Sequence, residues 1–266
     1  MKPVLLGLAL LLFFTEVCSA QTTLYFPQFV DGSQTLQVGG TEWGTTMLVT
    51  NPAASGTPTA SGTVTLTNSN GTPMNLTLLD SVTGIAGNTF QIAGGQTKFF
   101  ASPNLVTTSP MPFNVGFATV TSNIPVAGAS AFIEFIRSLP NGTIAVGGIP
   151  AATPLTRQAI VAVFNTGDPI HNVPTNNTGI AIANPGSSTT TITFQLVDSS
   201  GASIQPQVTQ TLAANNQAAF YFSNLFPSIP SPTTGMLRIT SNNPIVLTAL
   251  FFQGNAFGTI PSIPLQ

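Results

Sequence analysis

Apolar and polar residues alternate over short stretches of this chain, as they do in half-buried β-strands. The clearest cases are residues 63–67 and 191–196, where every second side chain is apolar and β-branched residues are frequent. Such alternation places the apolar side chains on one face of an extended strand. No window combines a sustained helical spacing of apolar residues with helix-capping residues. The pattern predicts an all-β fold, and the strands expected in the first half are residues 24–30, 45–50, 62–67, 74–79, 90–92, 98–101, 116–121 and 126–135.

Four blocks of sequence occur twice in the same order, which indicates an internal duplication. Two similar modules of seven or eight strands are therefore expected, with equivalent strands in the second copy from Ala159 onward. Extra residues in the first copy fall in 53–61 and 80–87, which are rich in Gly, Ser and Thr and indicate longer loops. The matched blocks are TTMLVTNP and TGIAIANP, NSNG and DSSG, IAGGQTKFFASPNLV and LAANNQAAFYFSNLF, and VGFATVTSNIPV and TGMLRITSNNPI.

Short strands separated by Gly, Pro and Asn turns are typical of two sheets packed as a sandwich. We therefore predict two tandem immunoglobulin-like antiparallel β-sandwich domains, at residues 21–137 and 158–266. Residues 138–157 contain several Pro and Gly residues and are expected to be a linker. Within that segment, GTIAVGGIP is similar to GTIPSIP near the end of the chain, so each copy is expected to close with the same extended tail.

Residues 1–20 have the three parts of a secretory signal peptide. Lys2 provides the positive start, residues 4–14 the apolar run, and Ser19 with Ala20 the small-residue exit. The apolar run is shorter than the roughly 20 residues that a membrane-spanning helix needs, and no second run follows. We expect a secreted or cell-surface protein that begins at Gln21 and has no integral membrane span. The only cysteine, Cys18, would be removed with the signal.

Charged residues make up 5% of the chain, against about 25% in ordinary soluble proteins. Beyond residue 20 the only cations other than histidine are Lys98, Arg137, Arg157 and Arg238. Proteins that bind nucleic acid neutralise several phosphates with such side chains. Nucleic acid is therefore not an expected partner.

Residues for catalysis or metal binding are sparse. His171 is the only histidine, and Asp168 is three residues away, but no nucleophile elbow accompanies them. One histidine without cysteine cannot provide the usual zinc ligands, and Asp198 in the turn DSSG offers a single carboxylate. We expect no catalytic residues, no metal site, no cofactor and no enzymatic activity.

Three aromatic residues are candidate ligand contacts. Trp43, the only tryptophan, lies between Glu42 and Gly44 just before an expected strand, where an exposed ring could stack on a sugar. Tyr25 and Tyr221 are weaker candidates. Aromatic side chains more often fill cores or close their edges.

The blocks TGIAIANPGS, VDSSG, NLFPSIP and GMLRITSNNPIVLTALFF resemble a class of tandem immunoglobulin-like β-sandwich repeats in secreted proteins of soil bacteria. The resemblance implies export and a modular β fold, but it carries no established activity. The leading hypothesis is a non-catalytic structural or interaction protein that presents two modules to a protein, a glycan or copies of itself. The alternative is a carbohydrate-binding accessory module that uses Trp43 and the long loops of the first copy.

Overall fold

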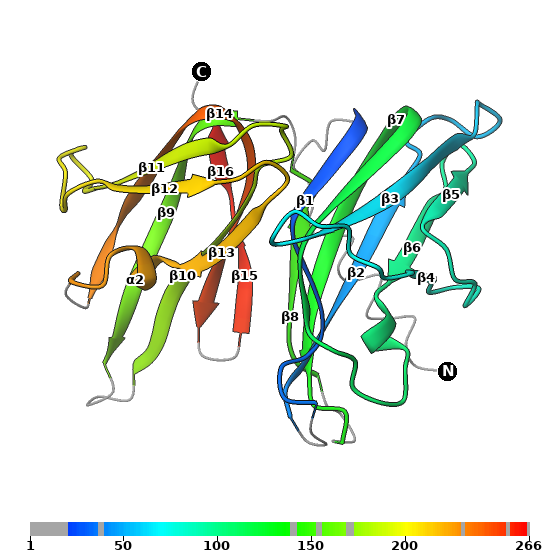
Figure 1. Ribbon diagram of the computed structural model, residues 1–266, viewed down its shortest axis with the longest axis horizontal. Coiled ribbons are helices and arrows are strands. Elements are labelled where there is room, and N and C mark those ends of the chain that lie inside the picture. The colour runs from blue at the N-terminus through cyan, green and yellow to red at the C-terminus, as the bar shows by residue number, and fades with distance from the viewer. Residues whose placement is uncertain are drawn as a thin grey trace.

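The computed structural model describes residues 21–36, 40–138, 143–152, 156–168, 173–229, 232–253 and 256–264. The expected signal peptide lies outside these residues. Nearly all regular structure is antiparallel β-strand, arranged in two curled sheets that stand side by side (Figure 1). The prediction of an all-β fold with two sandwich-like units is confirmed. None of the helices in the described part of the chain is long and apolar enough to cross a membrane.

The first sheet contains eight strands in the order β4-β6-β2-β1-β7-β3-β5, with β8 paired to β7. A short 3₁₀ turn, η1 (Pro103–Leu105), follows β6. The strands are β1 (Gln21–Ser33), β2 (Glu42–Thr50), β3 (Ala60–Asn68), β4 (Leu79–Asp80), β5 (Thr89–Ile92), β6 (Thr97–Ala101), β7 (Asn114–Phe135) and β8 (Thr143–Pro150).

The second sheet has the order β12-β11-β14-β10-β9-β16, with β13 paired to β10 and β15 to β14. A single helical turn, α2 (Phe222–Leu225), follows β13. The strands are β9 (Thr156–Asp168), β10 (Val173–Ala183), β11 (Thr190–Val197), β12 (Val208–Leu212), β13 (Gln217–Tyr221), β14 (Thr233–Gln253), β15 (Ala256–Ile260) and β16 (Ser262–Pro264).

The strand pairings reproduce the duplication seen in the sequence. Strand β7 pairs with β1, β2, β3 and β8, and β14 pairs in the same way with β9, β10, β11 and β15. The outer pairs also correspond, since β2 binds β6 as β10 binds β13, and β3 binds β5 as β11 binds β12. Each copy is thus built around one long central strand.

Each central strand was expected as two strands joined by a turn at the Thr-Ser-Asn-x-Pro block. In the structure the chain remains extended there and passes from one layer to the other, because residues 116–122 pair with β3 and residues 127–135 with β2. The residue before a proline is restricted to extended conformations. Ile124 before Pro125 and Asn243 before Pro244 therefore favour a bend over a reversal.

Two other expected elements differ from the structure. Residues 74–79 form little regular strand, and only Leu79–Asp80 pair with β6. Residues 143–150 of the expected linker form β8, which pairs with β7 and belongs to the first sheet. The glycines that suggested a linker, Gly147 and Gly148, lie within this strand, where a missing side chain leaves room for a neighbour. Along the chain, the two sheets are therefore linked by only the few residues between β8 and β9.

The buried asparagine of each Asn-Pro block has the same role in both copies. The Asn51 side-chain nitrogen donates to the carbonyls of Pro58 and Ile92, at 3.1 and 3.0 Å. The Asn184 nitrogen donates to Ser188 and Leu212 in the same arrangement, at 2.8 and 3.1 Å. Asn51 thus joins the loop after β2 to the end of β5, and Asn184 joins the loop after β10 to the end of β12. This part of the repeat therefore has a structural role.

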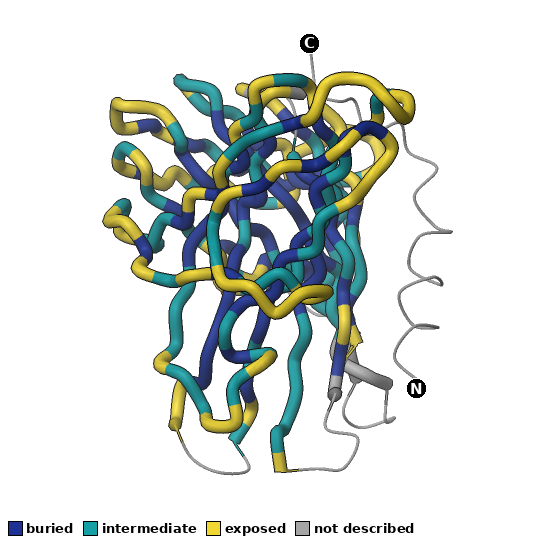
Figure 2. Tube along the Cα trace, turned by 90° about the vertical axis from the view of Figure 1, so that its right-hand side faces the viewer, coloured by how far each residue is buried: buried dark blue, intermediate teal, exposed yellow. Residues whose placement is uncertain are grey.

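Each copy has its own apolar core between its layers. The first core includes Leu24, Phe26, Met47 and Phe100, and the second includes Val161, Ile182, Phe194 and Leu237. In Figure 2 the buried segments run through the middle of the molecule while the exposed segments form the outer loops. Along β14, Ile239, Ile245 and Leu247 are buried, Phe251 is half-buried against the core, and Met236 is half-buried outside it.

A third apolar cluster joins the two units. It contains Val30, Phe132, Ala145 and Ile149 from the first unit and Leu250 and Phe257 from the second. At Gly147 the backbone faces the Phe257 ring so closely that an added Cβ would lie 2.1 Å from a ring carbon. The Thr259 hydroxyl donates to the Gly148 carbonyl, and the Gln217 side-chain nitrogen donates to Gln28 Oε1 at 2.6 Å. Strands β8 and β15 are consequently packed against each other (Figure 1).

The two units contribute different faces to this contact. On β2, Trp43 shares the strand face of Met47 and Val49, which belong to the first core. On β10, Gly179 and Ala181 lie on the face opposite Ile180 and Ile182, which belong to the second core. Alternate residues of a strand point to opposite faces. The inner side of the first unit therefore continues into the contact, whereas the second unit presents its outer side.

We expect Asn184→Ala to lower the free energy of unfolding by about 1–3 kcal/mol, because it leaves buried carbonyls without their donor. Denaturant unfolding measures the change. Ser187→Ala in the same loop, at an exposed position, is the control and should change stability by no more than about 0.5 kcal/mol. Equal effects of the two substitutions would contradict a structural role for the asparagine.

Phe257→Ala should weaken the contact between the units by removing a ring that is 9% exposed. Large-to-small substitutions of buried phenylalanine typically cost about 3–5 kcal/mol. Calorimetry should show a single unfolding transition for the parent chain and a broader or divided transition for the variant. Val82→Ala, at a residue that is 78% exposed, should leave the transition unchanged. An unaltered transition in the Phe257 variant would show that the contact contributes nothing to stability.

Candidate functional site

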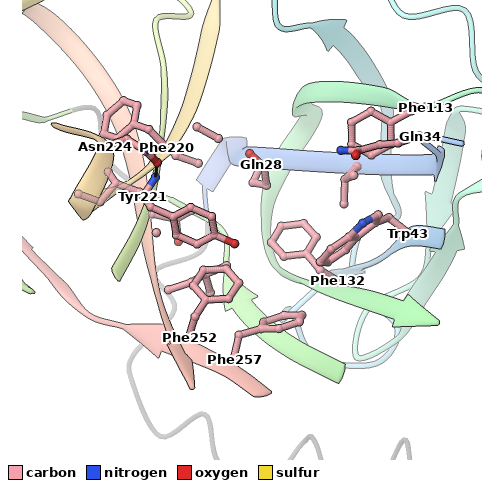
Figure 3. A pocket seen from close by; sticks show the side chains of 17 residues that line it. Gln28, Gln34, Trp43, Phe113, Phe132, Phe220, Tyr221, Asn224, Phe252 and Phe257 are labelled. Carbon is pink, nitrogen blue, oxygen red and sulfur yellow. Dashed lines mark hydrogen bonds between the residues drawn. The ribbon is translucent and has the colours of Figure 1, made fainter. Parts of the chain in front are cut away.

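A pocket of about 480 Å³ lies where the two units meet. Its first wall comes from β1, β2 and β7, and its second wall from β10, β13, β14, β15 and α2. Most of the lining side chains are apolar, and seven are aromatic, which is typical of sites for small molecules. The aromatic residues are Trp43, Phe113, Phe132, Phe220, Tyr221, Phe252 and Phe257 (Figure 3).

Four of these rings form a continuous row from one unit to the other. The centroids of Trp43 and Phe257 are 6.3 Å apart, with ring planes tilted by 37°. Phe257 is 5.5 Å from Phe252, and Phe252 makes an edge contact with Tyr221 at 5.2 Å. The row lies along the wall of the pocket, with the Tyr221 hydroxyl directed toward the open space (Figure 3). Because Tyr221 is 45% exposed, the pocket reaches the molecular surface.

A buried polar network holds the beginning of β2, and with it Trp43. The Glu42 carboxylate is 1% exposed and receives two hydrogen bonds from Arg137, at 3.1 and 2.8 Å. The Arg137 guanidinium also donates to Asn104. Asn104 in turn donates from its side chain to the Trp43 carbonyl at 3.0 Å. These bonds fix the strand on which the tryptophan lies.

Asp31 is a further member of this network. It is fully buried and accepts a hydrogen bond from the Asn104 backbone at 3.0 Å. Burial raises the pKa of Asp31 above its ordinary value, while bonding to Ser102 and Asn104 and the charge of Arg137 act in the opposite direction. Asp31 therefore holds a proton more tightly in the folded chain than in the unfolded chain.

Tyr221 is positioned by the helical turn that follows it. Its backbone nitrogen donates to Asn224 Oδ1 at 3.2 Å, which closes a capping box at the start of α2. Its strand partner on β10 is Gly179, and a Cβ there would meet the Phe252 ring. The absence of a side chain at Gly179 therefore leaves space for the aromatic row.

None of the described residues that line the pocket has a charged side chain. Glu134 is opposite Trp43 in the pairing of β2 and β7 and so shares its face. Burial raises the pKa of Glu134. Burial also raises the pKa of Tyr221, and the Glu134 charge raises it further. Glu134 thus influences the phenol of the other unit across the edge of the pocket.

The three candidate contact residues do not all meet. Trp43 and Tyr221 line the same pocket from opposite units. Tyr25 lies in a separate apolar cluster with Phe117, Ala183 and Val246. Sequence reasoning did not single out Phe132, Phe252 or Phe257, because nothing in a strand pattern shows which face will meet another unit. The only available signal was the similarity of the tails around Gly147 and Phe257.

The remaining candidates have structural settings or lie outside the described residues. Asp198 accepts bonds from Ser200 and Ala202 within its turn, and Gly201 there has a positive φ of 84°. Asp168 ends β9, whereas His171 lies outside the described residues. In the described part of the chain, no three His, Cys, Asp or Glu residues are grouped in a way that could hold a metal ion.

No protein-family profile and no curated protein matches the chain. Among solved structures, the Thermotoga maritima 1070 protein is similar over 42% of this chain and 96% of its own, with 15% identity and a TM-score of 0.33. The Anabaena sensory rhodopsin transducer is similar over 37% of this chain and 97% of its own, with 21% identity and a TM-score of 0.28. The C-terminal domain of the Streptococcus pyogenes antigen I/II-family protein AspA covers 91% of this chain and 99% of its own, with 8% identity and a TM-score of 0.18.

Asp31→Asn should change stability in a pH-dependent way. The raised pKa of Asp31 means that its contribution to stability is present below its unfolded pKa and is lost as pH rises through its folded pKa. An asparagine side chain at this position would accept the same backbone bond without ionising. D31N should therefore gain stability relative to the parent chain as pH rises from about 3 to about 7, as measured by urea unfolding.

Asp198→Asn is the control for this experiment. Hydrogen bonds from Ser200 and Ala202 lower the pKa of Asp198. Its contribution is present above its unfolded pKa and is lost as pH falls through its folded pKa. D198N should therefore lose stability relative to the parent chain over the same rise in pH. Two variants with the same pH dependence would contradict the opposite environments of these carboxylates.

Proposed function

We propose that this chain is a non-catalytic, secreted or cell-surface interaction protein whose two sandwiches act together, with the pocket between them as the ligand site. The observation that carries this proposal is the aromatic pocket, in which Trp43 and Phe132 of the first unit face Tyr221, Phe252 and Phe257 of the second (Figure 3). A ligand there would contact both units at once.

The chemistry of the lining supports binding over catalysis. General acid–base catalysis relies on groups that exchange protons near neutral pH. The described lining residues provide hydroxyls and amides, at Thr248, Tyr221, Gln28, Gln34 and Asn224, but no carboxylate, imidazole or amine. Such groups orient a ligand through hydrogen bonds while the aromatic rings bury its apolar surface.

Export of the protein remains part of this proposal. It is supported by the tripartite pattern of residues 1–20.

Carbohydrate binding is the second candidate function. It is favoured by the presence of Trp43 and Tyr221 in one pocket together with side-chain amides. No residue of the long loops 53–61 and 80–87 lines this pocket. A sugar site would therefore rest on the aromatic residues between the units and not on the loops of the first copy.

The uncharged fluorescent probe N-phenyl-1-naphthylamine tests the site in the purified full chain. We expect its emission to rise on binding, and the emission of Trp43, the only tryptophan, to change with the same dependence on probe concentration. Ala219→Phe should reduce the affinity at least about tenfold, about 1.4 kcal/mol, because it fills the pocket from an exposed lining position.

Ala213→Phe provides the matched control, since it places the same ring at an exposed position outside the lining. It should bind the probe as the parent chain does. Soluble cello-, xylo- and chito-oligosaccharides are titrated in parallel. Binding of a sugar that Ala219→Phe abolishes would favour the second candidate, whereas probe binding unaffected by Ala219→Phe would exclude the pocket as the site.

A further inference from the structure

We propose that the pocket between the sandwiches binds an organic cation, with a quaternary or alkylated ammonium group held among the aromatic rings and the Glu134 carboxylate at its edge. This inference rests on the proposed function, because it names the ligand class of the same pocket. It follows from the aromatic rings that converge on the pocket, from the position of Glu134 beside them, and from the hydrogen bonds that Gln28 and Asn224 already make within the protein.

The aromatic rings surround one space from both sides. Trp43 and Phe132 approach it from the first unit, and Tyr221, Phe252 and Phe257 approach it from the second (Figure 3). The negative face of an aromatic ring attracts an organic cation within about 6 Å, and several rings around one site are the usual means of binding quaternary ammonium groups. The volume of about 480 Å³ also leaves room for an apolar body attached to the cation.

Strand geometry places Glu134 beside these rings. Phe132 and Glu134 are two residues apart in β7 and so point to the same face. Trp43 is directly opposite Glu134, and Ala145 of β8 is opposite Glu134 on the other side. Ala145 belongs to the apolar cluster between the units, as does Phe132. The acid therefore lies next to Trp43 at the border of the pocket, where it would attract a cation.

The positive side chains of the first unit are engaged elsewhere. Lys98 forms an ion pair with Asp80 at 3.5 Å, and Arg137 forms one with Glu42 at 2.8 Å. Arg238 lies on the half of β14 that pairs with β11, whereas the pocket uses the half that pairs with β10. The acidic charge of Glu134 thus has no basic side chain among the lining residues to oppose it.

Two of the five polar side chains of the pocket are already engaged, which favours this ligand over a sugar. The Gln28 oxygen already accepts a bond from Gln217, and the Asn224 oxygen accepts one from the Tyr221 backbone. A sugar needs several free partners for its hydroxyl groups, since unpaired buried polar groups are costly. An alkylated ammonium group needs few hydrogen bonds and gains from burial among rings.

Three probes of nearly equal shape and different charge test the proposal. Choline is positive, 3,3-dimethylbutan-1-ol is its uncharged carbon counterpart, and 3,3-dimethylbutanoate is negative. Their binding to the purified full chain is measured through Trp43 emission and by calorimetry. We expect choline to bind at least about tenfold more tightly than the alcohol, in accordance with cation–π attraction, and the carboxylate to bind least. Equal affinities for choline and the alcohol would overturn the proposal.

Glu134→Gln separates the charge from the shape of the site. It should weaken choline binding several-fold and leave the affinity for the alcohol and for N-phenyl-1-naphthylamine unchanged. Asp198→Asn, which removes a carboxylate from an exposed turn of the second unit, should leave choline affinity as in the parent chain. Equal loss of choline binding in both variants would show only a long-range effect of net charge and would overturn the assignment to Glu134.

The outcomes also distinguish the two proposals. If the naphthylamine binds and Ala219→Phe prevents it, while choline does not bind, the pocket is a ligand site and the cation assignment is wrong. If no probe responds to Ala219→Phe, the proposed function itself fails. Oligosaccharide binding at the pocket in place of choline would overturn the cation assignment in favour of the carbohydrate alternative.

Discussion

The apolar contact between the two sandwiches is the interaction on which the rest of this structure depends. Phe257 of β15 packs against Gly147 of β8, and around it Val30, Phe132 and Leu250 close a cluster to which both units contribute. Burying aromatic and aliphatic surface is the main favourable term in such contacts. Without this contact, the two walls of the pocket would not face each other, and each unit would expose an apolar surface.

The asymmetry of the contact explains how two copies of one module produce a single site. In the first unit, the strand face that forms the core continues past Met47 to Trp43 and into the contact. In the second unit, the corresponding strand keeps Ile180 in its own core and turns Gly179 and Ala181 outward to the pocket. Duplication produced two similar sheets. Because the first sheet contributes its inner face to the pocket and the second its outer face, the two walls are lined by residues at different positions of the repeat.

Polar groups in the first unit serve this arrangement in a way that the second copy does not repeat. Glu42, Arg137 and Asn104 form a connected set of hydrogen bonds around the start of β2. Buried charges are tolerated when they are paired and hydrogen-bonded. In the matched blocks Ala218 takes the place of Lys98 while Phe220 repeats Phe100, so the copies differ in charge at a position within a common framework. The repeated Asn51 and Asn184 are unchanged between the copies.

The amino-acid sequence alone determined the strand class, the duplication and the local devices of each copy. Alternation over residues 63–67 and 191–196, the paired Asn-Pro blocks and the matching turns depend on neighbours in the chain, so they can be read directly. Trp43 and Tyr221 were also recognised as candidate contacts, from their residue type and context. Tertiary structure alone decided that these two residues line one pocket, that Tyr25 does not join them, and that Phe132, Phe252 and Phe257 line the same pocket, with Glu134 opposite Trp43 on the neighbouring strand. It also decided that β8 is a strand of the first sheet and that each central strand bends without reversing. The physical reason is that alternation divides a strand into two faces but does not specify which face a distant segment will cover, and that choice depends on how two completed sheets pack together.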